Sequence, residues 1–443
     1  MDRIRAGAWL LAVAILGLSV YATHAQDNPK KTDPAVKGKK EEPKAEEKKE
    51  PKVEIDPALK KQALALNDIT GSDALDEQLR KFIKDREAAK KLLAVAGEMA
   101  KDKDQPFGYN AALLLGKTAA IIKDPKASEM FYRLAGEKAA AIKSSSKLLA
   151  VYDGLISMHL DNNDYEKAAA ACKEFIKLPG DEQFERTKPF VQEKLIQSIA
   201  KQGKIEEALK LTQELLDDTN DSWYFMRLKA IVQREGELYQ DSADTYLEVL
   251  KKLRRSDLED EVRERFSEQI RYSLSSVYID LKEIDKAAEQ LEMLLKKKPD
   301  NATFNNDLGY IWADHDMKLD EAEKLIRKAL DEDKKMRDAI KDLPEELNKE
   351  NSSFLDSLGW VLFKKKNYAE AKKYLLKATE DEVGQHIEVL DHLADVHIQL
   401  GEIKEAVAVW EKALKVTKPT SKRERAKKAQ VEEKLKKYKP MVK

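Results

Sequence analysis

Beyond Pro57, apolar residues recur at helical spacing, with short polar breaks and without the alternation of a strand. One run has steps of 4, 3, 1 and 3, which place its members on a single helix face: Ile270, Leu274, Val277, Tyr278 and Leu281. A second run follows the polar segment 282–285: Ala287, Leu291, Leu294 and Leu295. Two amphipathic helices joined by so short a connection are expected to lie antiparallel and to cover each other.

A small residue opens the second helix of each predicted hairpin. These residues are Ala168, Ala208, Ala243, Ala287, Ala322, Ala371 and Ala406, at intervals of 40, 35, 44, 35, 49 and 35 residues. A base period of about 34 or 35 residues with insertions explains the intervals. Alanine is expected there because the two helices approach most closely near their turn. The pattern predicts an all-α solenoid of about eight or nine hairpins over residues 58–417, with an earlier, weaker pair that includes Leu115, Gly116 and Phe131 and an opening hairpin at 73–100.

The pattern resembles the tetratricopeptide repeat. That family's signature has a Leu-Gly or Leu-Ala step and a large residue in the first helix, followed by small and large apolar residues in the second. The best matches lie within residues 267–417: Leu308-Gly309-Trp312 with Ala322, Ile326 and Ala329; Leu358-Gly359-Leu362 with Ala371, Leu375 and Ala378; Leu393-Ala394-His397 with Ala406, Trp410 and Ala413. The resemblance implies a right-handed superhelix. Residues 332–350 insert about 16 residues into this pattern, and the first-helix match around Ala230 is poor.

The resemblance also implies a concave groove, lined by the first helices, in which a partner binds as an extended peptide or a helix. Carried over by position, the groove residues are Asn306, Tyr310, Asp314, Asp356, Trp360, Phe363, Lys364, Asp391, Asp395 and Gln399. The aromatic residues offer contact area, and the carboxylates would select a partner with Lys or Arg. The alternative is that Trp360 and Phe363 pack between adjacent hairpins. The clamp that holds a C-terminal carboxylate in some family members needs Lys and Asn at positions that are mostly Asp here.

The sequence predicts no catalytic site, cofactor or metal. It contains no Gly-rich phosphate loop, no Gly-x-Ser-x-Gly elbow and no zinc-type cysteine spacing. His386, His392 and His397 are spaced by six and five residues, which keeps them off one helix face. The single cysteine, Cys172, cannot form an internal disulfide.

The N-terminus indicates export. Arg3 and Arg5 precede an apolar run from Ala6 to Ala22 and a small-residue cleavage site ending at Ala25, so residues 1–25 are predicted to be a signal peptide, or alternatively an uncleaved inner-membrane anchor. Residues 26–57 hold five of the 13 prolines and few large apolar residues, which predicts a disordered Lys/Glu/Pro tether. The stretches NDLGYIWAD and LDSLGWVLF look similar to closing repeats of bacterial envelope proteins. A periplasmic or extracellular location, near membrane or wall, is therefore expected.

Charge separates two functional hypotheses. The chain has 81 Lys and Arg against 82 Asp and Glu, so no net field attracts nucleic acid. Residues 418–443 nevertheless carry 11 Lys and Arg against three Glu, together with Ala426, Ala429 and Leu435, which favours a basic capping helix. The leading hypothesis is a protein-interaction scaffold in the bacterial envelope. The alternative is a binding module for anionic polymer or a membrane surface, acting through this tail and the tether.

Overall fold

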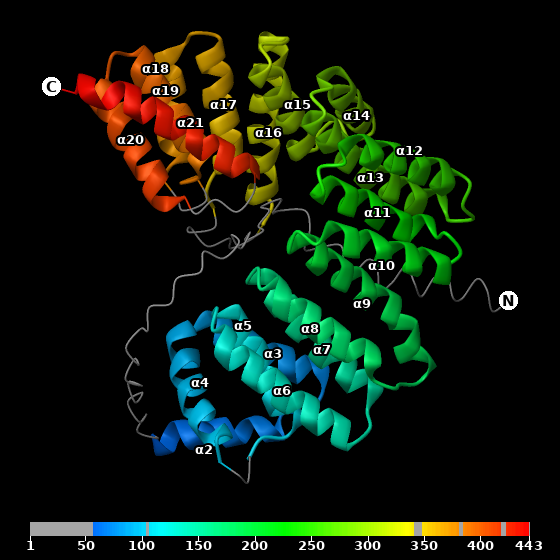
Figure 1. Ribbon diagram of the computed structural model, residues 1–443. Coiled ribbons are helices and arrows are strands. Elements are labelled where there is room, and N and C mark those ends of the chain that lie inside the picture. Colours follow the sequence, from blue (N-terminus) through cyan, green and yellow to red (C-terminus); the bar gives the residue numbers. More distant parts are fainter. Residues whose placement is uncertain (1–55, 103–105, 341–347, 381–383, 418–421, 443) are drawn as a thin grey trace, which may run out of the picture. The chain divides into compact units, whose positions relative to one another are not determined.

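A computed structural model describes residues 56–102, 106–340, 348–380, 384–417 and 422–442, and every regular element in these ranges is a helix (Figure 1). The predicted signal peptide and almost all of the predicted tether lie outside the described residues. No described helix is both long enough and apolar enough to cross a membrane.

The helices form two compact units. The N-terminal unit contains α2 (Pro57–Ala65), the 3-10 helix η1 (Leu66–Asp68), α3 (Ser72–Lys84), α4 (Arg86–Ala100), α5 (Tyr109–Ile121), α6 (Pro125–Ala141), α7 (Ser145–Asp161), α8 (Tyr165–Lys177), α9 (Glu182–Lys201), α10 (Ile205–Asp218) and α11 (Trp223–Glu235). The C-terminal unit contains α12 (Tyr239–Arg254), α13 (Asp260–Asp280), α14 (Ile284–Lys297), α15 (Ala302–Asp314), α16 (Leu319–Asp338), α17 (Ser352–Lys364), α18 (Tyr368–Ala378), α19 (Ile387–Gln399), α20 (Ile403–Val416), α21 (Lys422–Tyr438) and the 3-10 helix η2 (Lys439–Met441).

Successive helices pair as hairpins in both units. The pairs are α5–α6, α7–α8 and α9–α10 in the N-terminal unit, and α13–α14, α15–α16, α17–α18 and α19–α20 in the C-terminal unit. The predicted opening hairpin corresponds to α3 and α4, and the helix α2 before it begins at Pro57, where Asp56 Oδ1 accepts from Ala58 N at 2.7 Å. The all-α architecture of helical hairpins is thus confirmed.

Close helix crossing explains the small residues of the pattern. All seven alanines that open the predicted second helices are at most 1% exposed: Ala168, Ala208, Ala243, Ala287, Ala322, Ala371 and Ala406. Gly309 in α15 shows the same constraint, because a Cβ atom there would lie 2.7 Å from Ile326 Cγ1 and 2.8 Å from the Ala322 carbonyl oxygen of α16. A larger side chain at these positions would force the two helices apart.

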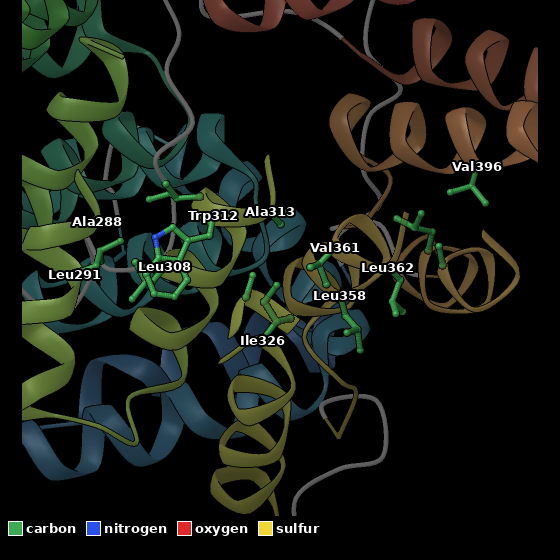
Figure 2. Close-up of a cluster of buried hydrophobic side chains, with 14 of the residues drawn as sticks. Ala288, Leu291, Leu308, Trp312, Ala313, Ile326, Leu358, Val361, Leu362 and Val396 are labelled. Atoms are coloured by element: carbon green, nitrogen blue, oxygen red, sulfur yellow. The ribbon is translucent and has the colours of Figure 1, made fainter. Parts of the chain in front are cut away.

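One hydrophobic core runs through the C-terminal unit from α14 to α19 (Figure 2). Each helix contributes residues from the predicted apolar stripe, for example Leu291, Leu308, Ile326, Leu358, Leu375 and Val396. Because every hairpin shares this core with its neighbours, burial rather than disulfide bonding holds the unit together.

The N-terminal unit also buries apolar side chains, among them Cys172 of α8. The Cys172 side chain is fully buried, and this burial raises the pKa of its thiol to about 12. Phe175, one turn further along α8, packs on Phe184 of α9 with ring centroids 4.4 Å apart. Helices α9 and α11 are joined by an ion pair between Glu193 and Arg227 at 2.6 Å.

Candidate functional site

The predicted groove residues lie on three first helices of the C-terminal unit. Helix α15 contacts α17, and α17 contacts α19, so these helices are neighbours. Two of them begin with an asparagine cap: Asn301 Oδ1 accepts from Phe304 N at 2.9 Å, and Asn351 Oδ1 accepts from Ser353 N at 2.9 Å. We call the set of predicted groove residues on α15, α17 and α19 the first-helix surface.

An aromatic stack occupies the middle of the first-helix surface. The Trp360 ring lies parallel to the His392 ring, with centroids 4.0 Å apart and an interplanar angle of 15°. The same indole is stacked with Phe363, at 4.9 Å and 6°. Trp360 and Phe363 are half-buried. The stack joins α17 to α19 and still leaves part of its aromatic surface open.

Polar contacts tie the end of α15 to α17 beside this stack. Trp360 Nε1 donates to Asp314 Oδ1 at 3.0 Å. Lys364 Nζ donates to the Asp314 carbonyl oxygen at 3.0 Å and forms an ion pair with Asp316 at 2.9 Å. The carboxylate of Asp314 is exposed and, among the described residues, accepts only this indole hydrogen bond. Its remaining lone pairs are available to a basic group.

Asp356 is buried and bonded within the protein. Its Oδ1 lies 2.9 Å from His392 Nδ1, and since a carboxylate oxygen accepts, Nδ1 carries the proton. The contact fixes the orientation of the His392 ring, whose face stacks on Trp360. Asp356 therefore fixes the His392 ring within the stack and, because it is buried, does not face a partner.

Asp391 is fully buried and is held by three donors. Trp410 Nε1 donates to its Oδ1 at 2.8 Å, while Lys427 and Lys434 of α21 form ion pairs with it at 2.9 and 2.8 Å. Burial alone would raise the pKa of Asp391, but the two lysines hold it below its usual value. Lys434 also pairs with Asp395 at 2.7 Å. Burial, together with the neighbouring Asp391, raises the pKa of Asp395.

Helix α21 covers the last hairpin through a mixed apolar and charged contact. It touches both α19 and α20, just as α19 touches both α17 and α18. Val431 is fully buried in a cluster with Ile387, Leu390 and Trp410, and Tyr438 stacks on Trp410 with centroids 5.6 Å apart. Ala426 and Ala429, the apolar positions noted in the sequence, are exposed, because the helix turns Val431 and Leu435 toward the core instead.

The structure thus sorts the first-helix surface into three groups. Asn306, Asp356 and Asp391 are buried, which corrects the expectation that they face a partner. Tyr310, Trp360, Phe363, Lys364 and Asp395 are half-buried, and Asp314 and Gln399 are exposed. Sequence reasoning missed the pairing of Asp391 with α21, for which the only signal was the excess of positive charge after residue 418.

The histidines are engaged separately. His386 Nε2 lies 3.4 Å from Glu424 Oε1, and His397 Nδ1 lies 2.6 Å from Glu402 Oε2. In the part of the chain that the structure describes, no group of three His, Cys, Asp or Glu side chains could hold a metal ion.

Comparison with known families assigns the repeats. The tetratricopeptide repeat family matches residues 272–337, 353–380 and 387–419. These three ranges are tetratricopeptide repeats. The first matched range runs from within α13 through α14 and α15 into the last turn of α16, the second covers the α17–α18 hairpin apart from the first residue of α17, and the third contains α19–α20. The resemblance drawn from Leu308-Gly309-Trp312 and its counterparts is therefore confirmed.

Three individual proteins that are similar to this chain carry the name of the same repeat. A TPR repeat-containing protein of Pseudomonas aeruginosa is 31% identical over 112 residues, which are 24% of this chain and 16% of that protein's length. A tetratricopeptide repeat protein from Parabacteroides merdae has a TM-score of 0.44 and 17% identity over 64% of this chain and 97% of that one. A thermophilic TPR protein of Thermus thermophilus gives a TM-score of 0.36 and 16% identity, over 47% and 98% of the two chains.

Tetratricopeptide repeats generally form non-catalytic scaffolds for protein–protein interaction. The coarse functional prediction, a protein-interaction scaffold, is in line with the repeats of this chain.

Proposed function

We propose that this protein is an interaction scaffold of the bacterial envelope that binds a segment of a partner protein on the α15–α17 part of the first-helix surface. The observation that carries the proposal is the stack of the half-buried Trp360 and Phe363 with the buried His392, next to the exposed carboxylate of Asp314. An aromatic platform beside an acidic group fits a partner segment that offers Lys or Arg together with an apolar or aromatic residue.

The ion pairs of the first-helix surface leave fewer carboxylates available to a partner than the sequence suggested. Asp391 and Asp395, two of its expected acidic groups, are occupied by Lys434. A partner cation would have to displace Lys434 to reach either carboxylate, whereas Asp314 can accept one without breaking an ion pair. The α19 end of the surface is therefore the less favourable half, and the partner is expected on α15 and α17.

Site-specific photocrosslinking in intact cells tests this function. A photoreactive residue at Tyr310, one turn before Asp314 on α15, is expected to capture a discrete partner, and the same residue at the exposed Lys412 of α20 is expected not to. Replacing Trp360 by Leu should abolish the Tyr310 crosslink while leaving the helix content measured by circular dichroism unchanged. Equal capture from Tyr310 and Lys412, or capture that persists in the Trp360→Leu variant, would contradict the proposal.

Export is part of this proposal and is supported by the N-terminal sequence, which lies outside the described residues. Arg3 and Arg5 precede the apolar run from Ala6 to Ala22. Residues 1–57 fused to alkaline phosphatase, an enzyme that is active only outside the cytoplasm, should give an active reporter. Deletion of residues 6–22 should remove that activity. An inactive full fusion that is present at normal abundance would refute the envelope location.

The basic segment is less suited to the alternative function, binding of an anionic polymer or membrane surface. Lys427, Lys434 and Lys439 form ion pairs within the protein, with Asp391, Asp395 and Glu411. These contacts lower the positive charge that the segment can present to a polyanion.

A further inference from the structure

A cavity of about 320 Å³ is lined by residues of α12, α13 and α14 of the C-terminal unit and shares no residue with the first-helix surface. Its apolar side is formed by Leu253, Leu294 and Met293, of which Met293 is 39% exposed. Five of its lining residues are cationic and a single one, Glu264, is acidic. A cavity with an apolar side and a strongly positive rim is unusual for a surface on which charges are otherwise balanced.

The cavity is built by an insertion into the repeat. Ala243 and Ala287 are 44 residues apart, rather than the 35 residues that separate three other pairs of these alanines. The additional residues lengthen α13 to 21 residues, whereas α15, α17 and α19 have 13 each. The N-terminal turns of α13 then carry Arg263 and Glu264 into the wall of the cavity. The site is therefore a feature of this chain and not of the repeat.

Two of the five cations bond to neighbouring residues of α13 and of the connection between α12 and α13. Arg263 Nη1 donates to the carbonyl oxygens of Leu258 at 2.9 Å and Ser256 at 3.3 Å, and its Nη2 bonds to Asp260. These bonds hold the connection between α12 and α13. Lys297 of α14 pairs with Glu264 of α13. Both cations are neutralised or used as donors, so they are not the groups that a ligand would meet first.

The other three cations have no carboxylate partner within the described ranges. Arg254, Arg271 and Lys296 form no ion pair with any acidic side chain of the described residues. Arg271 is nevertheless held in place, because its Nη1 donates to Gln290 Oε1 at 2.8 Å and contacts Met293 Sδ at 3.2 Å. Gln290 is buried. Neutral partners orient the guanidinium without cancelling its charge, which leaves a positioned cation beside an apolar surface.

We infer that this cavity binds an acidic segment of a partner protein, with a carboxylate on Arg271, Arg254 or Lys296 and an adjacent apolar side chain against Leu253 and Met293. The planar guanidinium fork of arginine matches a carboxylate through two parallel hydrogen bonds. The charge that this cavity selects is opposite to that of the first-helix surface, where Asp314 favours a basic segment. The cavity is thus a second peptide site that does not depend on the proposed groove function.

A peptide array probes the inference directly. Octapeptides that place Glu beside Leu or Met are spotted next to matched peptides with Gln in place of Glu, and the array is incubated with the purified protein. We expect the Glu peptides to be retained over the Gln peptides. In fluorescence anisotropy, Arg271→Gln should weaken the best Glu peptide by about tenfold, the loss of one charge-assisted contact. Lys412→Gln, at an exposed position of α20, should leave its affinity unchanged.

Two results would overturn the assignment. Equal retention of Glu and Gln peptides would show that the cavity does not recognise a carboxylate. Unchanged peptide affinity in both Arg254→Gln and Arg271→Gln would show that the peptide binds elsewhere. Vesicles of phosphatidylglycerol and of phosphatidylcholine form a further arm: binding to the anionic vesicles alone, lost in Arg271→Gln, would assign the site to lipid instead. The Trp360→Leu variant should keep its peptide affinity, which separates this site from the groove.

Discussion

The Nζ atom of Lys434 lies 2.8 and 2.9 Å from the two carboxylate oxygens of Asp391, although 43 positions separate the residues in the chain. Asp391 is fully buried, so its charge depends on this partner and on Lys427. The last hairpin of a repeat array has an apolar face with no following repeat to cover it. Here α21 covers that face, and the buried carboxylate selects the helix that carries lysines at the right spacing.

Lys434→Met is expected to destabilise the docking of α21 by about 2–4 kcal/mol, because it leaves a buried carboxylate with one cation fewer. Hydrogen–deuterium exchange of α21 and α19 amides measures the effect. Lys436→Met, on the exposed side of the same helix, is the matched control and should change protection little. Equal protection in the two variants would show that Val431 and its apolar neighbours suffice to hold α21.

The same contact should make α21 sensitive to acid. The pKa of Asp391 is below its usual value in the folded protein, so its stabilising contribution is present at neutral pH and is lost as the pH falls through that lowered pKa. The pKa of Asp395 is raised, so its ionised form opposes folding at neutral pH and protonation relieves this. Because this lowered pKa lies below the usual carboxyl value, Asp391 is still ionised at pH 4, and the cost of Lys434→Met should fall only at lower pH, as Asp391 becomes protonated. A cost that grows on acidification would contradict the assignment of charges.

Two glycine-to-alanine substitutions are expected to have opposite signs. Gly309→Ala would press a methyl group against Ile326 and the Ala322 carbonyl oxygen, and should destabilise the C-terminal unit by about 1–3 kcal/mol. Gly97→Ala places its methyl group 3.7 Å from Met130 Cε, an ordinary contact, and should stabilise the N-terminal unit by about 0.5–1 kcal/mol through helix propensity. Urea unfolding followed by circular dichroism decides both. Destabilisation by Gly97→Ala would show an unrecognised close approach at α4.

A double-mutant cycle should detect coupling between Asp356 and His392. Asp356→Ala leaves the buried His392 Nδ1 without its acceptor, at a cost of about 1–3 kcal/mol. When His392→Ala is already present, Asp356→Ala should cost less, with a coupling energy of at least about 0.5 kcal/mol. Additive effects would indicate that His392 is held by its stack on Trp360 alone.

The repeat register was readable from the sequence because it follows from local geometry. A small residue at each close helix crossing and a large residue between crossings produce the same sequence pattern in every repeat. All seven predicted alanines are buried. The register also identified Trp360 and Phe363 as neighbours on one face, which are stacked in the structure.

The register could not say what occupies that face. Asp391 holds a groove position by spacing, yet it is buried because α21, which lies outside the repeat pattern, docks on it. The cavity at Arg271 left only an indirect trace, the 44-residue interval between Ala243 and Ala287. A long interval reveals an insertion, but the three-dimensional packing decides whether that insertion becomes a loop or a binding site.

The rate at which the buried Cys172 of α8 can be labelled reports how often the N-terminal unit opens. It is the single cysteine of the chain, and both its burial and its raised pKa suppress the reactive thiolate. A thiol reagent can therefore label the native protein only when the surroundings of α8 open. The labelling rate, compared with that of the unfolded chain, reports the opening free energy of the N-terminal unit alone, while ligands of the C-terminal unit act at a thiol-free site.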